Sequence, residues 1–124
     1  MPTRTQGRLT VPLVELHGDS GRIDAAKLAD FLHIPLVQLA EGLRAKYPSV
    51  HKTPDASSLQ QALGPIKRVL ELITAVTRGQ NEALAWLNNP HPDLGNRTPL
   101  SVILSGHADA VVTLLDNAID GIPS

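Results

Sequence analysis

The chain has 124 residues, a formal net charge of −1 at pH 7 and no cysteine. This length suits one domain or two very small ones, and the lack of cysteine excludes disulfides and thiolate metal sites. A net charge so close to zero gives no overall attraction to nucleic acid or to a membrane surface. No apolar stretch has the length of a membrane span, so we expect a soluble, cytoplasmic protein.

The first twenty residues give conflicting signals. Leu9, Val11 and Leu13 alternate as in a strand, but Pro12 interrupts the pattern because it cannot donate to a sheet. An edge strand, an extended arm and a short helical turn all remain open for this segment.

Capping residues and prolines predict helices in the rest of the first half. Side chains such as Asp24 and Thr53 accept hydrogen bonds from free amides at a helix start, and proline suits the first helical position. The predicted helices cover residues 24–32, residues 35–46, and a stretch from 53 that is broken or kinked at Gly64–Pro65.

The clearest amphipathic helix follows Pro65. Its apolar residues recur at the spacing of one helical face, and its polar residues occupy the opposite face. The predicted inner face is Ile66, Val69, Leu70, Ile73, Val76 and Thr77, and the predicted outer face is Lys67, Glu71, Thr74 and Arg78. Gly79 ends this helix, and residues 82–87 form another short one that buries Trp86.

A connector rich in proline and asparagine, residues 88–97, precedes the last two helices. Thr98–Pro99 starts the first of these, Gly106 ends it, and the final helix covers residues 107–120. The predicted inner face of the final helix is Ala108, Val111, Val112, Leu115 and Ile119. Leu94 is the large apolar side chain that attaches the connector to the core. We predict an all-α fold, a small helical bundle, with one core that contains Trp86, Leu87, Leu94, Leu100, Leu104, Val112 and Leu115.

An ordered set of residues extends through the second half of the chain: A-x-x-W-L, a proline-rich turn with a leucine, T-P-L, an S-G stop and a final D-G-I. They are Ala83, Trp86, Leu87, Asn88, Pro90, Leu94, Thr98, Pro99, Leu100, Ser105, Gly106, Asp120, Gly121 and Ile122. From the Ile66 helix onward, the chain resembles the toxin-binding domain of the Xre/MbcA/ParS-type antitoxins.

The resemblance implies a function and a domain division. In that family the domain neutralises a toxin, commonly a RES-domain protein that consumes NAD or transfers ADP-ribose from it. The N-terminal half of such antitoxins resembles a helix-turn-helix fold that can bind the operon's own promoter. The chain would then be a type II antitoxin and not an enzyme, with a helix-turn-helix-like part at 1–64 and a toxin-binding domain at 65–124. We expect a homodimer or a hetero-oligomer with the toxin, and no cofactor.

Two registers compete for the helix-turn-helix. One uses LADFLHIPLVQL with Ala29 at the helix crossing, and the other uses LAEGLRAKYPSVHK with Ala40 there. A recognition element needs donors for phosphates and base edges, and the first register offers almost none. We prefer the second, with a solvated basic loop as the open alternative. Its candidate DNA-binding residues are Arg44, Lys46, Ser49, His51 and Lys52.

The final helix carries an acidic outer face. Asp116 and Asp120 lie near its carboxyl end, where the helix dipole disfavours negative charge, so a partner could be what requires them there. A carboxylate could occupy the arginines with which a toxin holds the NAD pyrophosphate. The predicted toxin-binding residues lie on the connector, this face and the tail: Asn88, Asn89, His91, Asp93, Arg97, Asp109, Thr113, Asp116, Asn117, Asp120, Gly121, Ile122 and Pro123.

Other chemistries find no support in the sequence. The five histidines lack metal-site spacing, and Ser101, Ser105 and His107 lack the strained turn of a nucleophile elbow. The alternative function is a helix-turn-helix transcription regulator or adaptor whose C-terminal helices serve dimerisation.

Overall fold

A computed structural model describes residues 15–120. Seven α-helices and two short 3-10 helices make up this part of the chain, which contains no β-strand. They are α2 (Ala25–Leu32), α3 (Leu36–Gly42), α4 (Tyr47–Lys52), η1 (Ser57–Leu59), α5 (Gln60–Val76), α6 (Gln80–Leu87), η2 (Pro92–Leu94), α7 (Pro99–Leu104) and α8 (Ala108–Asp120). The all-α prediction is confirmed. The ambiguous pattern at residues 9–13 lies outside the described residues.

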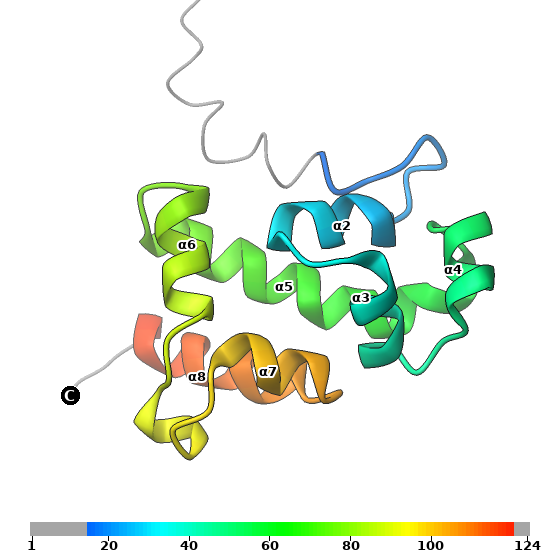
Figure 1. Ribbon diagram of the computed structural model, residues 1–124. Coiled ribbons are helices and arrows are strands. Elements are labelled where there is room, and N and C mark those ends of the chain that lie inside the picture. Colours follow the sequence, from blue (N-terminus) through cyan, green and yellow to red (C-terminus); the bar gives the residue numbers. More distant parts are fainter. Residues whose placement is uncertain (1–14, 121–124) are drawn as a thin grey trace, which may run out of the picture.

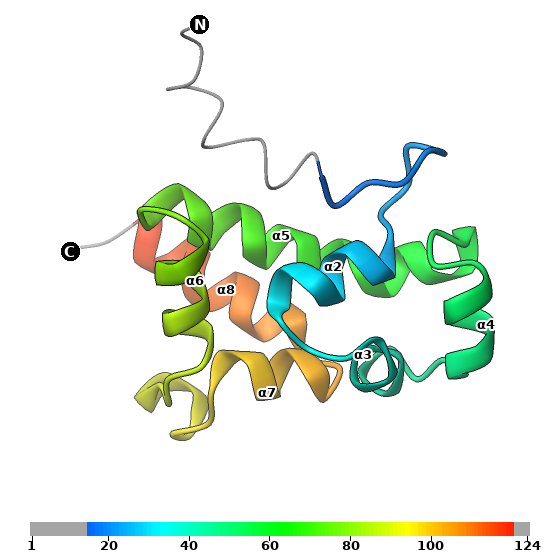
Figure 2. The same cartoon turned by 45° about the horizontal axis from the view of Figure 1, so that its top comes forward.

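Helix α5 passes through the middle of the bundle, and the other helices pack around it (Figure 1). Helices α2 and α3 lie along one side, α4 lies near the start of α5, and α6 crosses its far end. Helix α8 lies beside α5 and runs in the same direction, whereas α7 runs back antiparallel to α8 (Figure 2). The C-terminal end of α8 therefore emerges at the end of the bundle that α6 covers.

Local capping signals identify two helix starts correctly. Asp24 caps α2 by accepting a hydrogen bond from the Lys27 amide at 3.0 Å. Thr98 caps α7 in the same way, accepting from the Ser101 amide at 3.1 Å, and Pro99 takes the first helical position. In both cases one side chain satisfies an amide that the helix itself leaves free.

Two other boundaries were predicted wrongly. Helix α3 ends at Gly42 and not at residue 46, because Arg44 adopts a left-handed backbone conformation (φ 57°) that a right-handed helix cannot continue through. Thr53 does not cap a new helix. Its amide donates to the Ser49 carbonyl at 3.0 Å and thereby closes the C-terminal end of α4.

The predicted break at Gly64–Pro65 does not occur, because α5 is one continuous helix of 17 residues. Pro65 lies near the beginning of this helix and removes only one backbone donor. Leu63 and Ile66 on either side of it are buried in the core. We attribute the continuity to this packing, which holds the helix together across the proline.

The core is aliphatic apart from Phe31 and draws on every α-helix of the described chain. Leu87, Leu100 and Leu115 are buried as predicted, whereas Trp86, Leu94, Leu104 and Val112 are half-buried and pack against the core from outside. The predicted burial of Val76 and Ile119 is wrong, since both are exposed at helix ends.

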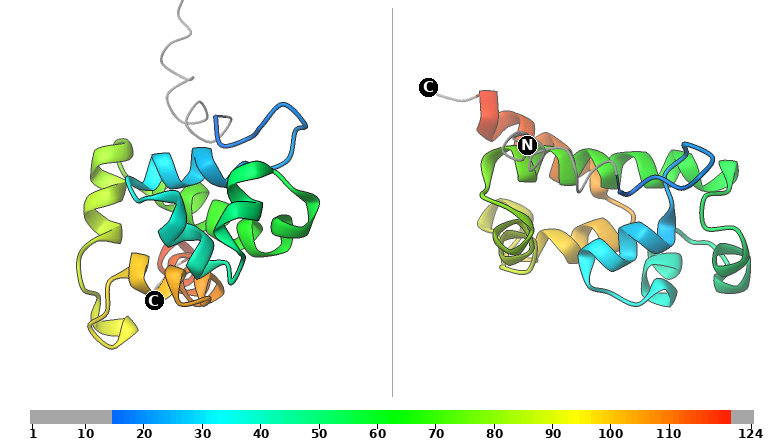
Figure 3. Two further views of the ribbon diagram at one scale, coloured as in Figure 1. Left: turned by 45° about the vertical axis from the view of Figure 1, so that its right-hand side comes forward. Right: turned by 90° about the horizontal axis from the view of Figure 1, so that it is seen from above.

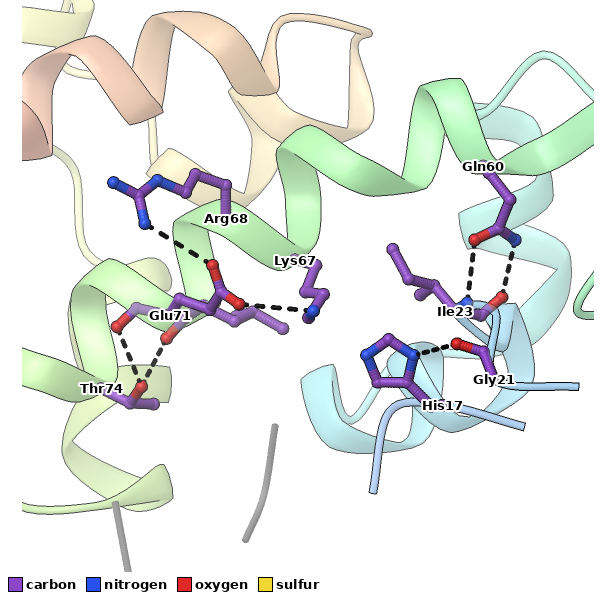
Figure 4. A network of polar contacts seen from close by, with 9 residues as sticks. His17, Gly21, Ile23, Gln60, Lys67, Arg68, Glu71 and Thr74 are labelled. Carbon is purple, nitrogen blue, oxygen red and sulfur yellow. Dashed lines mark hydrogen bonds and ion pairs between the residues drawn. The ribbon is translucent and has the colours of Figure 1, made fainter. Parts of the chain in front are cut away.

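Thr74 was predicted to face solvent, but it is buried on α5. Its hydroxyl donates to the Leu70 carbonyl at 2.6 Å, so the polar atom of this buried side chain has a hydrogen-bond partner (Figure 4). A threonine bonded to its own helix in this way can enter a core at little cost.

Polar side chains fasten the N-terminal turn to the start of α5. The Gln60 amide accepts from the Ile23 N–H at 2.8 Å and donates to the Ile23 carbonyl at 2.9 Å, as a neighbouring strand would (Figure 4). Ser20 Oγ donates to Asp55 Oδ2 at 2.6 Å, and Arg22 Nε donates to the Asp55 carbonyl at 2.8 Å. The Ser20 hydrogen bond lowers the pKa of Asp55 below its ordinary value of 3.8, with a smaller contribution from Arg22.

The predicted domain boundary at 64/65 falls inside α5, and residues on both sides of it belong to one hydrophobic cluster. No helix within residues 15–120 has the length and apolar character needed to cross a bilayer.

Candidate toxin-binding surface

The connector between α6 and α7 folds into a closed turn. The His91 amide donates to the Arg97 carbonyl at 3.0 Å, and the Leu94 amide donates back to the His91 carbonyl at 2.9 Å. Gly95 and Asn96 both adopt left-handed conformations, which reverse the chain. The connector is therefore an ordered loop whose backbone is bonded to itself.

Helices α6 and α7 hold this loop at its two ends. The side-chain amides of Asn88 and Asn89 donate to carbonyls at the C-terminal end of α6, at 2.8 and 2.7 Å. The Trp86 and His91 rings meet edge to face with centroids 6.0 Å apart, and Arg97 donates to the Ser101 carbonyl of α7 at 3.3 Å. Trp86 thus serves as a half-buried support for the loop.

Of the predicted loop residues, Asn88, Asn89, Asp93 and Arg97 are exposed and His91 is half-buried. The two asparagines already use their amide donors within the chain, which leaves their oxygens free for a partner. In the described residues, no hydrogen bond or ion pair joins the loop to α8. The loop and the C-terminal end of α8 nevertheless lie toward the same end of the bundle (Figure 2).

On α8, the predicted residues Asp109, Thr113, Asn117 and Asp120 are all exposed. Asp116 is half-buried, and its carboxylate lies 3.9 Å from the Arg68 guanidinium of α5. Gly121, Ile122 and Pro123 lie outside the described residues.

The sequence interpretation did not identify Arg68. This side chain also lies 3.6 Å from Glu71, which in turn pairs with Lys67 at 3.4 Å (Figure 4). The neighbour of Arg68 on α8 depends on which helix packs beside α5, and no local sequence pattern gives that information.

The predicted DNA-binding residues lie at the other end of the bundle. Arg44 and Lys46 precede α4, and Ser49, His51 and Lys52 belong to it; all five are exposed. Helix α4 lies beside the start of α5, whereas α6 and the C-terminal end of α8 lie beside its end (Figure 1). The two candidate surfaces are therefore separated by the length of α5.

The described residues contain no group of three or more histidine, aspartate or glutamate side chains that could hold a metal ion. Ser105 Oγ lies 3.1 Å from His107 Nδ1 and 2.8 Å from the Val102 carbonyl, in the turn that joins α7 to α8. These contacts close the C-terminal end of α7.

Comparison with known families identifies the C-terminal part. Residues 72–121 match the model of the antitoxin Xre/MbcA/ParS C-terminal toxin-binding domain. No curated protein and no solved structure gives a significant match to the chain. The matched segment contains the last turn of α5, the loop and helices α6 to α8, which include the predicted toxin-binding residues up to Gly121. The resemblance seen in the sequence is confirmed for residues 72–121, which match the toxin-binding domain model of the Xre/MbcA/ParS antitoxins.

Proposed function

We propose that the chain is the antitoxin of a type II system and inhibits a RES-domain toxin in the cytoplasm by covering its active site. The match of residues 72–121 to a toxin-binding domain carries this proposal. The partner would be a protein that consumes NAD or transfers ADP-ribose from it. The chain would act by binding and not by catalysis.

The outer face of α8 would supply the charged part of the contact, through Asp109, Asp116 and Asp120. The Arg68–Asp116 pair is long, and both side chains are about half exposed; pairs of this kind contribute little to stability. Asp116 could therefore exchange Arg68 for an arginine of the toxin at small cost. Bidentate carboxylate–arginine bonds would then occupy the position of a pyrophosphate.

The loop at residues 88–97 would supply a second, neutral part of the contact. Its hydrogen bonds to α6 and α7 fix its shape before binding, so little conformational entropy is lost when a partner docks. We assign this role to Asn88, Asn89, His91, Asp93 and Arg97. Thr113 and Asn117 would contribute from α8, and Gly121, Ile122 and Pro123 from the tail.

Co-expression tests the proposal. A RES-domain protein encoded beside this chain should arrest growth when expressed alone, and growth should recover when the chain is expressed with it. The pair should also co-purify. If the chain neither restores growth nor co-purifies with that protein, the proposed function is wrong.

A double variant tests the acidic face. Asp116→Ala with Asp120→Ala should weaken inhibition of NAD consumption, and added salt should reduce the difference from wild type. The matched control is Asp30→Ala with Glu41→Ala, which removes the same charge from exposed positions on α2 and α3. Equal inhibition by both double variants would exclude the acidic face from the contact.

Autorepression is a second candidate function, favoured by the exposure of the five polar residues at and before α4. One such unit reads half a site, so we expect a dimer on the promoter. Lys46→Ala with Lys52→Ala should weaken promoter binding and reduce its salt dependence. Unchanged binding in a filter or gel-shift assay would exclude this register.

A further inference from the structure

Four large apolar side chains of the described residues are exposed: Val37 by 45%, Tyr47 by 40%, Val76 by 54% and Ile119 by 44%. Val37 and Tyr47 lie on α3 and α4, outside the segment that matches the toxin-binding domain. Val76 and Ile119 lie inside it, near its beginning and its end. Sequence periodicity had assigned both of them to the core.

Val76 and Ile119 lie at the same end of the bundle. Val76 is the last residue of α5, and Ile119 is the last but one of α8. The two helices lie side by side and run in the same direction in Figures 1 and 2, and the view from above in Figure 3 (right) shows that both end on the same side of the molecule. Ile66 of α5 and Asp109 of α8 both line a pocket of about 310 Å³, together with residues of α3 and α7, so the two helices are already neighbours near the start of α8.

The apolar contact between α5 and α8 is covered for most of its length and open at this end. One turn before the exposed residues, Leu72 and Leu115 are both buried. One turn further along each helix, Val76 and Ile119 are exposed. Asp116 and Asp120 lie on either side of Ile119 in the sequence, so carboxylates border the apolar surface on α8.

We propose that Val76 and Ile119 form an apolar docking point for the toxin, here named the apolar end pair. The partner that fits has an apolar surface with a basic rim, which would meet Asp116 and Asp120. The inference rests on the proposed function and adds α5 to the contact surface. Apolar residues surrounded by charge are the usual composition of an interface centre and its rim.

A second copy of the chain fits this end less well. Helix α8 carries three aspartates and no basic residue. A two-fold contact would place the same surface on both sides and would bring like charges from the two α8 helices together, which disfavours association.

The test uses single substitutions in the full chain and the RES-domain protein encoded beside it as the probe. Val76→Lys and Ile119→Lys place a cation against the basic rim, and lysine is tolerated at the C-terminal end of a helix. Val76→Thr keeps the shape of valine and replaces one methyl group by a hydroxyl. Val37→Lys is the matched control, because its exposure is similar and it lies outside the matched segment. Circular dichroism and thermal melting check that each variant is folded.

Each lysine variant of the apolar end pair should bind the probe about tenfold or more weakly, Val76→Thr should bind a few-fold more weakly, and Val37→Lys should bind as wild type does. Wild-type binding by both Val76→Lys and Ile119→Lys would overturn the inference and leave the proposed function intact. If the wild-type chain does not bind the probe, the inference and the proposed function are both wrong. Sedimentation gives the oligomeric state of each variant. If the wild-type chain associates with itself and Val76→Lys is a monomer, the inference is also overturned, because the apolar end pair would then be a contact between copies.

Discussion

The region before α5 and the region after it are fastened in different ways. Up to the first residue of α5, side-chain hydrogen bonds join residues far apart in the sequence, such as Gln60 with Ile23 and Asp55 with Ser20 and Arg22. After α5, the side-chain bonds within the region join residues no more than four apart, as in the loop and the caps of α7. Gln80 reaches back to the Phe31 carbonyl at 2.9 Å, across the two regions.

The difference bears on where a partner can bind. Apolar faces fix the position of α6 to α8, and apart from Gln80 and Asp116 their polar groups make local contacts or remain exposed. A surface whose side chains are not engaged in distant contacts can bind another protein without breaking its own fold. The N-terminal turn, by contrast, uses its polar groups to hold itself in place.

The largest expected effect follows from the apolar packing of the second region. Leu87 is fully buried on α6, so Leu87→Ala should lower the free energy of unfolding by about 2–5 kcal/mol. Trp86→Ala should cost less than Leu87→Ala despite the greater volume removed, because Trp86 is half-buried. Chemical denaturation measures the free energy of unfolding of both variants. A larger loss for Trp86→Ala than for Leu87→Ala would contradict the half-buried position of Trp86 as a support for the loop.

The next largest effect on stability should come from the packing of α3 against α7, one helix from each region. A Cβ atom on Gly42 of α3 would lie 3.0 Å from the Leu104 carbonyl oxygen and 3.1 Å from its Cα on α7. Gly42→Ala should therefore destabilise the chain by about 1–3 kcal/mol. Gly64→Ala is the matched control, since its Cβ would meet nothing and alanine is favoured inside α5. Equal melting temperatures for the two variants would show that α3 and α7 do not approach this closely.

Breaking the distant polar contacts of the first region should have a smaller effect. Gln60→Ala leaves both backbone groups of Ile23 without their partner and should cost about 1–2 kcal/mol. Gln61→Ala at the adjacent exposed position should be close to neutral. If the two variants denature alike, the Gln60 contacts contribute nothing to stability.

The smallest effect concerns Asp55, which is half-buried at the surface. Because its pKa is lowered in the folded chain, its charged form contributes stability that is present above the unfolded value of about 3.8 and is lost as the pH falls through the folded value. Asp55→Asn should melt below wild type at neutral pH, and the difference should disappear under acid conditions. Asp19→Asn, next to Ser20 on the N-terminal turn, is the control, and a pH-independent difference for Asp55→Asn would contradict this linkage.

Local chemistry made part of the fold predictable. Asp24 and Thr98 were identified because a cap and its amide lie within three residues of each other. The end of α3 was missed because Arg44, which is not glycine, adopts the left-handed conformation. The Gln60 contacts were missed because their partner lies 37 residues away.

The candidate site likewise has one part that could be predicted from the sequence and one part that could not. The loop and the acidic face of α8 were predicted from residues that are close in sequence. The positions of Arg68 and Val76 depend on α8 lying beside α5. Periodicity placed Val76 and Ile119 inside because it cannot show where a neighbouring helix ends.

Hydrogen exchange of the free chain and of its complex with the co-encoded RES-domain protein tests the central claim most directly. Exchange reports protection segment by segment. We predict that binding slows exchange in α8, in residues 88–97 and in the last turn of α5, and leaves residues 44–52 unchanged. Slowed exchange in residues 44–52, with α8 unaffected, would contradict the account and place the toxin on the other end of the bundle.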